Sequence, residues 1–138
     1  MATFLKPVLR NLGEPYDPGE YELRNERAGT VLATRVLTAF DSASRRTGLL
    51  RHESLPLGTG LIIAPSNAVH TFFMRFAIDV AFVTKDGRVV KLRAAVPPWR
   101  LTGALRGYAV VELPAGTLER TGTRSGDRLM IVQHSTHD

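Results

Sequence analysis

The sequence predicts a mainly β, single-domain protein: an antiparallel β sandwich or barrel-like sheet with one short helix. Three observations predict this fold class. Short apolar segments rich in β-branched residues recur between turn residues along the chain. Glycine and proline contribute 12 and 8 of the 138 residues, which favours turns over long helices. The length suits one hydrophobic core, and 43% hydrophobic against 22% charged residues is typical of a globular domain.

The chain divides into three parts. Residues 1–20 are crowded with glycine and proline, which predicts an N-terminal arm or loop. Residues 21–132 contain the apolar segments and form the predicted β domain. Residues 133–138 are polar and form the predicted C-terminal tail. The expected strands are 21–24, 30–37, 61–64, 69–75, 78–85, 88–95, 108–113 and 128–132.

Two segments have helical features. Asp41 is a favourable N-cap for a helix over residues 42–50, because its side chain can accept from the first free backbone N–H groups. One helical turn is expected over residues 117–121, where Gly122 can end it. Between the strands expected over residues 88–95 and 108–113, Pro97 opens a predicted long loop.

The dipeptide Asp86-Gly87 predicts a two-residue β turn, since both central positions of a type I′ turn need positive φ. Such a turn places Ala81 opposite Leu92 and Asp79 opposite Ala94. The other side chains on this side of the hairpin are apolar. The sequence therefore predicts a carboxylate, that of Asp79, at the end of an apolar face.

A buried carboxylate without partners is costly, so Asp79 needs hydrogen-bond donors or a proton. The candidate donors are His70, Thr71 and Arg75, shortly before it, and Arg45, Arg46 and Arg51, around the predicted helix. Two interpretations stay open. An internal pair with an arginine, or acceptance of backbone N–H groups, would be structural. A polar pocket in which Asp79 and an arginine contact a ligand would be functional.

Glu112 lies in an otherwise apolar strand, so its carboxylate is either buried or exposed at the strand end. Pro114 follows closely and favours the strand end. His70, Asp79 and Glu112 could hold a metal ion, but they lack the spacing of a ligand motif, so no metal site is predicted. Trp99 is expected to pack in the core or at its rim; exposed to solvent, it would be a candidate for stacking on a ligand.

Composition and motifs exclude several classes of protein. The absence of cysteine excludes disulfides, thiolate nucleophiles and zinc–thiolate sites. No apolar segment reaches membrane-spanning length, and the first residues lack the pattern of a secretory signal, so a cytoplasmic protein without membrane contact is expected. No hydrolase, phosphate-loop, dinucleotide or zinc-protease motif occurs, so no cofactor is expected.

The net charge is +5, and 15 of the 18 basic residues are arginine, which suits contacts to carboxylate or phosphate. The basic residues are scattered, however, with acidic residues between them and no basic run. The sequence therefore argues against nucleic acid as a partner, and its charge indicates a solvated basic surface.

Five segments together resemble the bacterial and archaeal DUF192 family of unknown function. They are residues 46–51 (RTGLLR), 70–82 (HTFFMRFAIDVAF), 86–90 (DGRVV), 111–116 (VELPAG) and 126–127 (GD). The resemblance implies a compact, mainly β domain and no established reaction. Ala77 and Leu50 depart from the family pattern, where proline and methionine are usual, but neither replaces a polar residue. The matching polar positions are Arg46, Arg51, His70, Arg75, Asp79, Glu112 and Asp127.

The leading hypothesis is a non-catalytic module that binds a small polar or anionic ligand, or a partner segment. Its expected site is the polar cluster of Arg46, Arg51, His70, Arg75, Asp79 and Glu112. One alternative is an enzyme in which Asp79 or Glu112 is the general base and an arginine holds an oxyanion. Another is a structural or interaction protein in which a buried Asp–Arg cluster only fixes the fold. The oligomeric state stays open.

Overall fold

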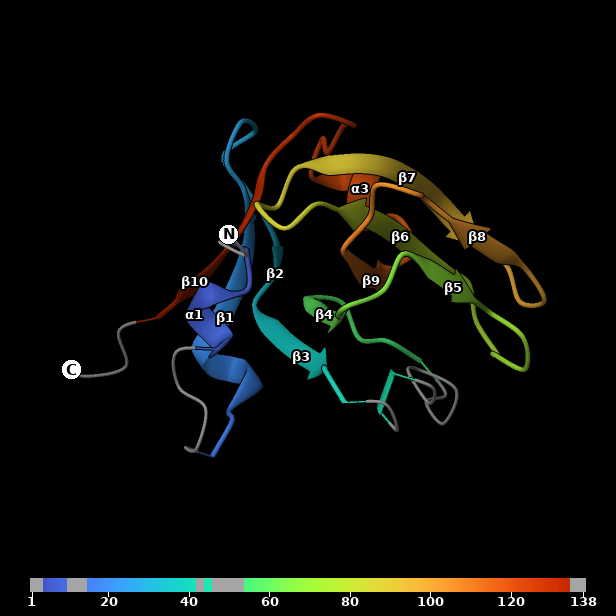
Figure 1. The fold of residues 1–138 in the computed structure, drawn as a ribbon, viewed down its shortest axis with the longest axis horizontal. Helices are drawn as coiled ribbons and strands as arrows, with labels where there is room; N and C mark the ends of the chain where they lie inside the picture. Colours follow the sequence, from blue (N-terminus) through green and yellow to red (C-terminus); the bar gives the residue numbers. More distant parts are fainter. Residues whose placement is uncertain (1–3, 10–14, 42–43, 46–53, 135–138) are drawn as a thin grey trace.

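The computed structural model describes residues 4–9, 15–41, 44–45 and 54–134 (Figure 1). The protein is mainly β, with several sheets and few short helices, as the sequence predicts. Among the described strands, none of the sheets closes into a barrel. The described part contains no helix that is long and apolar enough to cross a membrane.

A five-stranded sheet forms the centre of the molecule. In sheet order its strands are β3 (Arg35–Ala39), β4 (Thr59–Ile63), β9 (Ala109–Pro114), β6 (Ile78–Val83) and β7 (Val89–Val96). The outer pair, β3 and β4, is parallel, which departs from the antiparallel arrangement of the other pairs. Every residue of β6 and β9 is buried, so both faces of this sheet are covered.

A three-stranded antiparallel sheet lies over one face of the central sheet. The predicted strand over residues 30–37 is in fact two strands, because the backbone N–H groups of Thr34 and Arg35 both donate to the carbonyl of Gly58. The chain leaves one sheet and enters the other at this point. The order of the three-stranded sheet is β10 (Leu129–Gln133), β1 (Tyr21–Asn25) and β2 (Thr30–Ala33).

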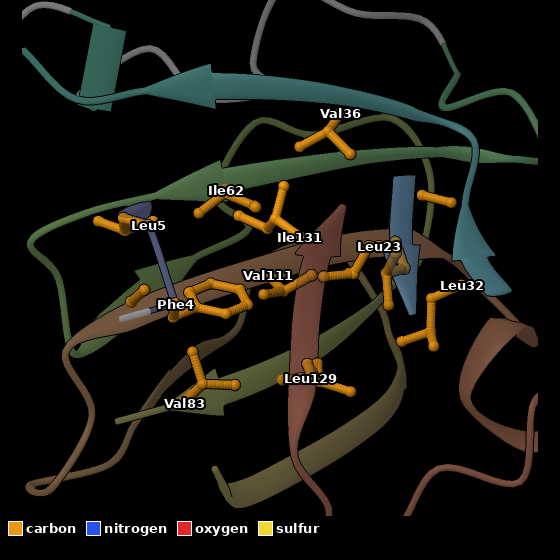
Figure 2. Close-up of a cluster of buried hydrophobic side chains, with 14 of the residues drawn as sticks. Phe4, Leu5, Leu23, Leu32, Val36, Ile62, Val83, Val111, Leu129 and Ile131 are labelled. Atoms are coloured by element: carbon orange, nitrogen blue, oxygen red, sulfur yellow. The ribbon is translucent and has the colours of Figure 1, made fainter. Parts of the chain in front are cut away.

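Two hydrophobic cores flank the central sheet. The first lies between it and the three-stranded sheet, where Leu23, Ile131, Ile62 and Val111 meet (Figure 2). The N-terminal arm contributes to it: Phe4, Leu5 and Val8 are buried there, around α1 (Lys6–Leu9). The second core lies on the other face and includes Ile63, Met74, Ile78, Phe82 and Val110. Apolar burial of this kind is the main favourable term in folding.

The β6–β7 hairpin has the predicted register in its middle only. Ala81 faces Leu92 as predicted, but the turn spans three residues: the N–H of Thr84 donates to the carbonyl of Arg88. The two-residue prediction is wrong, since the left-handed residue is Gly87 alone, at the end of the turn. Two bulges in β7 then change the pairing on either side of the central register.

A two-stranded sheet, β5 (Ala68–His70) with β8 (Leu101–Gly103), completes the fold. The predicted strand over residues 69–75 ends at His70, because the N–H of Met74 turns back to the carbonyl of Thr71. The predicted long loop after Pro97 contains β8, which the sequence pattern did not indicate. In Figure 1 this sheet lies on the right, and α1 and β10 lie on the left.

The remaining helices are short. A 3-10 helix, η1 (Pro18–Glu20), leads into β1, and α3 (Thr117–Arg120) confirms the helical turn expected after β9. Asp41 caps as predicted: its carboxylate accepts the N–H of Ser44 at 2.7 Å. The rest of the helix expected over residues 42–50 lies outside the described residues.

Candidate functional site

Asp79 is fully buried in β6, and its carboxylate accepts three backbone N–H groups. Oδ1 accepts from Ala95 at 2.8 Å, and Oδ2 accepts from Gly116 at 3.1 Å and Leu118 at 2.9 Å. Gly116 and Leu118 begin α3, whose first N–H groups have no partner within the helix. Ala95 sits in the second bulge of β7 with a φ of 49°. Asp79 therefore joins that bulge to α3. Of the two structural partners that the sequence left open, an arginine or backbone N–H groups, these contacts are of the second kind.

Glu112 lies in the middle of the central sheet, paired with Leu61 on one side and Val80 on the other. It is 2% exposed, and its Oε1 has no hydrogen-bond partner. Loss of water around it raises the pKa of this carboxyl to about 8. The preference for an exposed strand end is wrong, because Pro114 is itself within β9, opposite Ile78, and does not end the burial.

Asp79 and Glu112 lie on opposite faces of the sheet. Cross-strand partners share a face, and Asp79 is paired with Leu113 of the first core, whereas Glu112 is paired with Val80 of the second. The two carboxyl groups that the sequence placed in one cluster are thus separated by the sheet itself. They do not form one site.

The four basic members of the expected cluster are either exposed or outside the described residues. Arg46 and Arg51 are not described. His70 is exposed on β5, and Arg75 is exposed in the loop that follows. Within the described part of the chain, no group of three histidine, aspartate or glutamate side chains could hold a metal ion.

The exposed side chains that do gather are aromatic. We call them, with one leucine, the aromatic surface: His70, Phe72, Phe73, Trp99 and Leu101. The rings form a continuous series, with centroid separations of 5.1 Å from His70 to Phe72, 6.0 Å from Phe72 to Trp99 and 4.7 Å from Trp99 to Phe73. Phe73 is 69% exposed, Trp99 57% and Leu101 71%. Large apolar side chains gathered in water are a common mark of a binding surface.

The backbone under this surface is held in unusual conformations. Phe73 has a φ of 67° and Trp99 a φ of 69°, values that bulky residues rarely adopt. Buried Thr71 holds the loop that contains Trp99. Its Oγ1 donates to the carbonyl of Pro97 at 2.6 Å and accepts the N–H of Arg100 at 2.9 Å. Its carbonyl accepts the N–H of Trp99 at 3.0 Å. The loop of residues 97–100 is thereby fixed to the segment that contains Thr71.

The surroundings of the aromatic surface are basic. The aromatic surface comes from residues 54–78 and 87–111, and neither segment contains an aspartate. The first segment ends before Asp79, and the second begins after Asp86. Glutamate is absent from both segments as well. The same segments expose Arg75, Arg100 and Arg106. This part of the molecule therefore favours an anionic partner.

Sequence reasoning anticipated only part of this surface. The sequence makes Trp99 a candidate for stacking on a ligand if it is exposed to solvent, and in the structure it is exposed. The sequence places the pair Phe72-Phe73 in the strand expected over residues 69–75, where one of two neighbouring side chains would point inward. Both rings are exposed, and Phe73 has a positive φ that no residue pattern signals.

Asp127, the remaining position matched by the resemblance, has a structural role. Its carboxylate accepts from Arg27 at 2.6 Å and from Asn25 at 2.9 Å, and the N–H of Arg124 donates to it at 2.8 Å. The Arg27 guanidinium holds the pKa of this carboxyl well below its usual range. These contacts join the β1–β2 turn to the loop before β10.

Comparison with known proteins identifies relatives along most of the chain. The model of the DUF192 family, described as "Uncharacterized ACR", matches residues 23–131. A UPF0127 protein of Pyrococcus furiosus is 40% identical over 76 residues, which are 54% of this chain and 61% of that protein's length. A UPF0127 protein of Thermococcus sibiricus is 30% identical over 113 residues, covering 78% of this chain and 72% of the relative.

Solved structures share the fold. The crystal structure of a protein of unknown function from Novosphingobium aromaticivorans has a TM-score of 0.68 at 25% identity, covering 79% of this chain and 81% of that one. A candidate transcription regulator from Sinorhizobium meliloti has a TM-score of 0.71 at 23% identity, covering 85% and 96%, and this likeness supports the fold alone. Because the family model spans most of the described β domain, the chain belongs to the DUF192 family.

Proposed function

We propose that the chain is a non-catalytic binding module, and that its aromatic surface takes up a small anionic molecule with a planar ring. One observation carries the proposal: Phe73 and Trp99 are held in water, at positive φ, beside exposed arginines. A backbone conformation of this kind costs on the order of 1–3 kcal/mol for each residue, and such strain clusters at ligand sites. Folding alone gives no reason to hold two large rings outward at that cost.

The ring and the charge of the proposed ligand follow from different features. Trp99 and Phe73 offer apolar faces on which a planar ring can stack. Arg100, the neighbour of Trp99, is exposed, and its planar guanidinium suits a phosphate or carboxylate. The acid-free segments around it leave no competing carboxylate in the local sequence.

The catalytic alternative has less support. A general base must come within hydrogen-bond reach of the proton that it abstracts. Asp79 is fully buried with its oxygens occupied by backbone N–H groups, and Glu112 is 2% exposed within the central sheet. Neither carboxyl group reaches the aromatic surface. The contacts of Asp79 favour a structural role for that residue.

The test uses Trp99, the single tryptophan of the chain, as a built-in fluorophore. Its fluorescence is titrated with AMP, adenosine and ribose 5-phosphate. AMP carries both a ring and an anion, so we expect saturable quenching by AMP, weaker binding of adenosine and little response to ribose 5-phosphate. Phe73→Ala should weaken AMP binding by about tenfold, the loss of roughly 1.4 kcal/mol of stacking.

The matched control is Leu57→Ala, which removes an apolar side chain that is 79% exposed elsewhere on the molecule. This variant should bind AMP as the wild-type protein does. The proposal is wrong if none of the three compounds changes the fluorescence of Trp99, or if Phe73→Ala and Leu57→Ala bind AMP equally well.

A further inference from the structure

The aromatic surface is longer than one ring of a ligand can cover. From His70 through Phe72 and Trp99 to Phe73, four rings follow one another at separations of 4.7 to 6.0 Å. A single base or other planar ring covers about one of them. A ligand that repeats its ring along a chain can use several together.

The surface is also open. Sites for small molecules are usually concave and enclose most of the ligand. Here Phe73 is 69% exposed and Trp99 57%, so the protein leaves much of each ring in water. Proteins that bind single-stranded nucleic acids combine such exposed aromatic platforms with basic residues along the backbone path.

The basic residues are scattered in the sequence but gathered by the fold. Arg100 lies between Trp99 and β8, and Arg106 lies in the turn after β8. Arg75 follows the turn after β5, and β5 pairs with β8. The sequence argued against nucleic acid because it contains no basic run; the pairing of β5 with β8 brings the separate arginines to one end of the molecule.

We infer that the aromatic surface binds single-stranded nucleic acid, with successive bases stacked on its rings and phosphates near Arg75, Arg100 and Arg106. This inference rests on the proposed function and extends it from one ring to a chain of rings. Single strands are expected to bind better than duplexes, because bases within a duplex are already stacked on each other and cannot lie on a protein ring.

The first experiment measures fluorescence anisotropy of an end-labelled single-stranded DNA of mixed sequence on addition of the full chain. We expect it to bind at least tenfold more tightly than AMP and than the duplex of the same sequence. With about three phosphate contacts, the affinity should fall roughly 20-fold between about 50 and 200 mM salt.

Two pairs of variants test whether the single strand binds by stacking and by specific charge contacts, or only by general attraction to a basic protein. Phe73→Ala should weaken the single-strand complex at least fivefold, and Leu57→Ala should not. Arg100→Ala should weaken it and reduce its salt dependence. Arg120→Ala removes the same charge from exposed Arg120 on α3 and should leave the affinity almost unchanged.

The outcomes distinguish this inference from the proposed function. If AMP binds and the single strand binds no more tightly, the inference is overturned and the proposed function stands. If neither binds, both are overturned. Equal binding of single strand and duplex, unaffected by Phe73→Ala, would mean general ionic attraction and would overturn the inference. Binding of the chain to phosphatidylglycerol vesicles but not to the oligonucleotide would overturn it in favour of a lipid surface.

Discussion

Two carboxyl groups on neighbouring strands of the central sheet have opposite surroundings. Asp79 has three hydrogen-bond donors, all from the backbone, whereas Oε1 of Glu112 has none. An oxygen without a donor costs free energy when it is buried, and the cost is larger when it is charged. The two residues therefore make different predictions for the free energy of unfolding.

Glu112 makes the stability of the protein depend on pH. The pKa of Glu112 is about 8 in the folded protein, against an ordinary value of 4.5 for a glutamate in water. The folded state therefore binds the proton more tightly than the unfolded state does. The free energy of unfolding then falls as pH rises from the lower to the higher of these values. Between about pH 5 and pH 9 the expected loss is on the order of 4 kcal/mol, and Glu112→Gln should remove it. Denaturant unfolding of both proteins at these pH values measures the difference; parallel curves would show that Glu112 is not protonated by burial.

Asp79→Asn tests the structural role of Asp79. An asparagine amide can accept hydrogen bonds through only one atom, so at least one of the three N–H groups would face its NH₂ group. We expect a loss of about 3 kcal/mol in the free energy of unfolding. Asp17→Asn, at an exposed cap where an asparagine oxygen can still accept, should change little. A variant as stable as the wild type would mean that the charge of Asp79 serves something other than the fold.

At the scale of elements, the hairpin of β6 and β7 depends on how its turn meets β10. Gly87 has a φ of 90°, and its carbonyl accepts the N–H of Leu129. A Cβ on Gly87 would lie 2.4 Å from the carbonyl oxygen of Leu129. The turn is thus held both by its own conformation and by close contact with another strand.

Gly87→Ala should therefore destabilise the protein more than Gly126→Ala. Gly126 has a similar φ of 93°, but a Cβ there would meet no atom within 4 Å. Both variants carry the strain of a left-handed alanine, and only Gly87→Ala adds the clash. We expect an additional loss of about 2 kcal/mol in thermal or denaturant unfolding. Equal losses would contradict the contact between the turn and β10.

The same hairpin shows how far local sequence determines structure. Alternation of apolar residues and the Asp86-Gly87 signal predict the central pairing of Ala81 with Leu92, which the structure confirms. The bulges were not predictable, since they depend on Asp79 binding the N–H of Ala95 and on residues distant in sequence. Likewise β8 has little strand signal of its own and forms because β5 and Thr71 offer it backbone partners.

The candidate site also has one feature that the sequence predicts and others that it does not. The burial of Asp79 follows from the hairpin face, which the sequence predicts. The separation of Asp79 from Glu112 needs the pairing of β6 with β9, which joins segments distant in sequence. The outward direction of Phe73 depends on a backbone conformation that no side-chain pattern encodes.

At the scale of the whole molecule, the exposed rings of the proposed binding surface belong to neither core, although Met74, next to Phe73, packs into the second one. Most residues of the two cores, together with Asp79 and Glu112, belong to the central sheet and the layer over it. The aromatic surface lies at the β5–β8 side, to the right in Figure 1. Changes at Phe73 or Arg100 should accordingly alter binding while leaving the cores intact.

The most direct measurement is a two-dimensional nitrogen–proton NMR titration of the isotope-labelled chain with AMP. The single tryptophan gives one indole N–H signal, which assigns Trp99 at once. If AMP binds at the aromatic surface, this signal moves together with the backbone signals of His70, Phe73 and Arg100, while the signals of Glu112 and its neighbours stay in place. A spectrum unchanged at saturating AMP, or movement centred on Glu112 with Trp99 unaffected, would contradict binding at this surface.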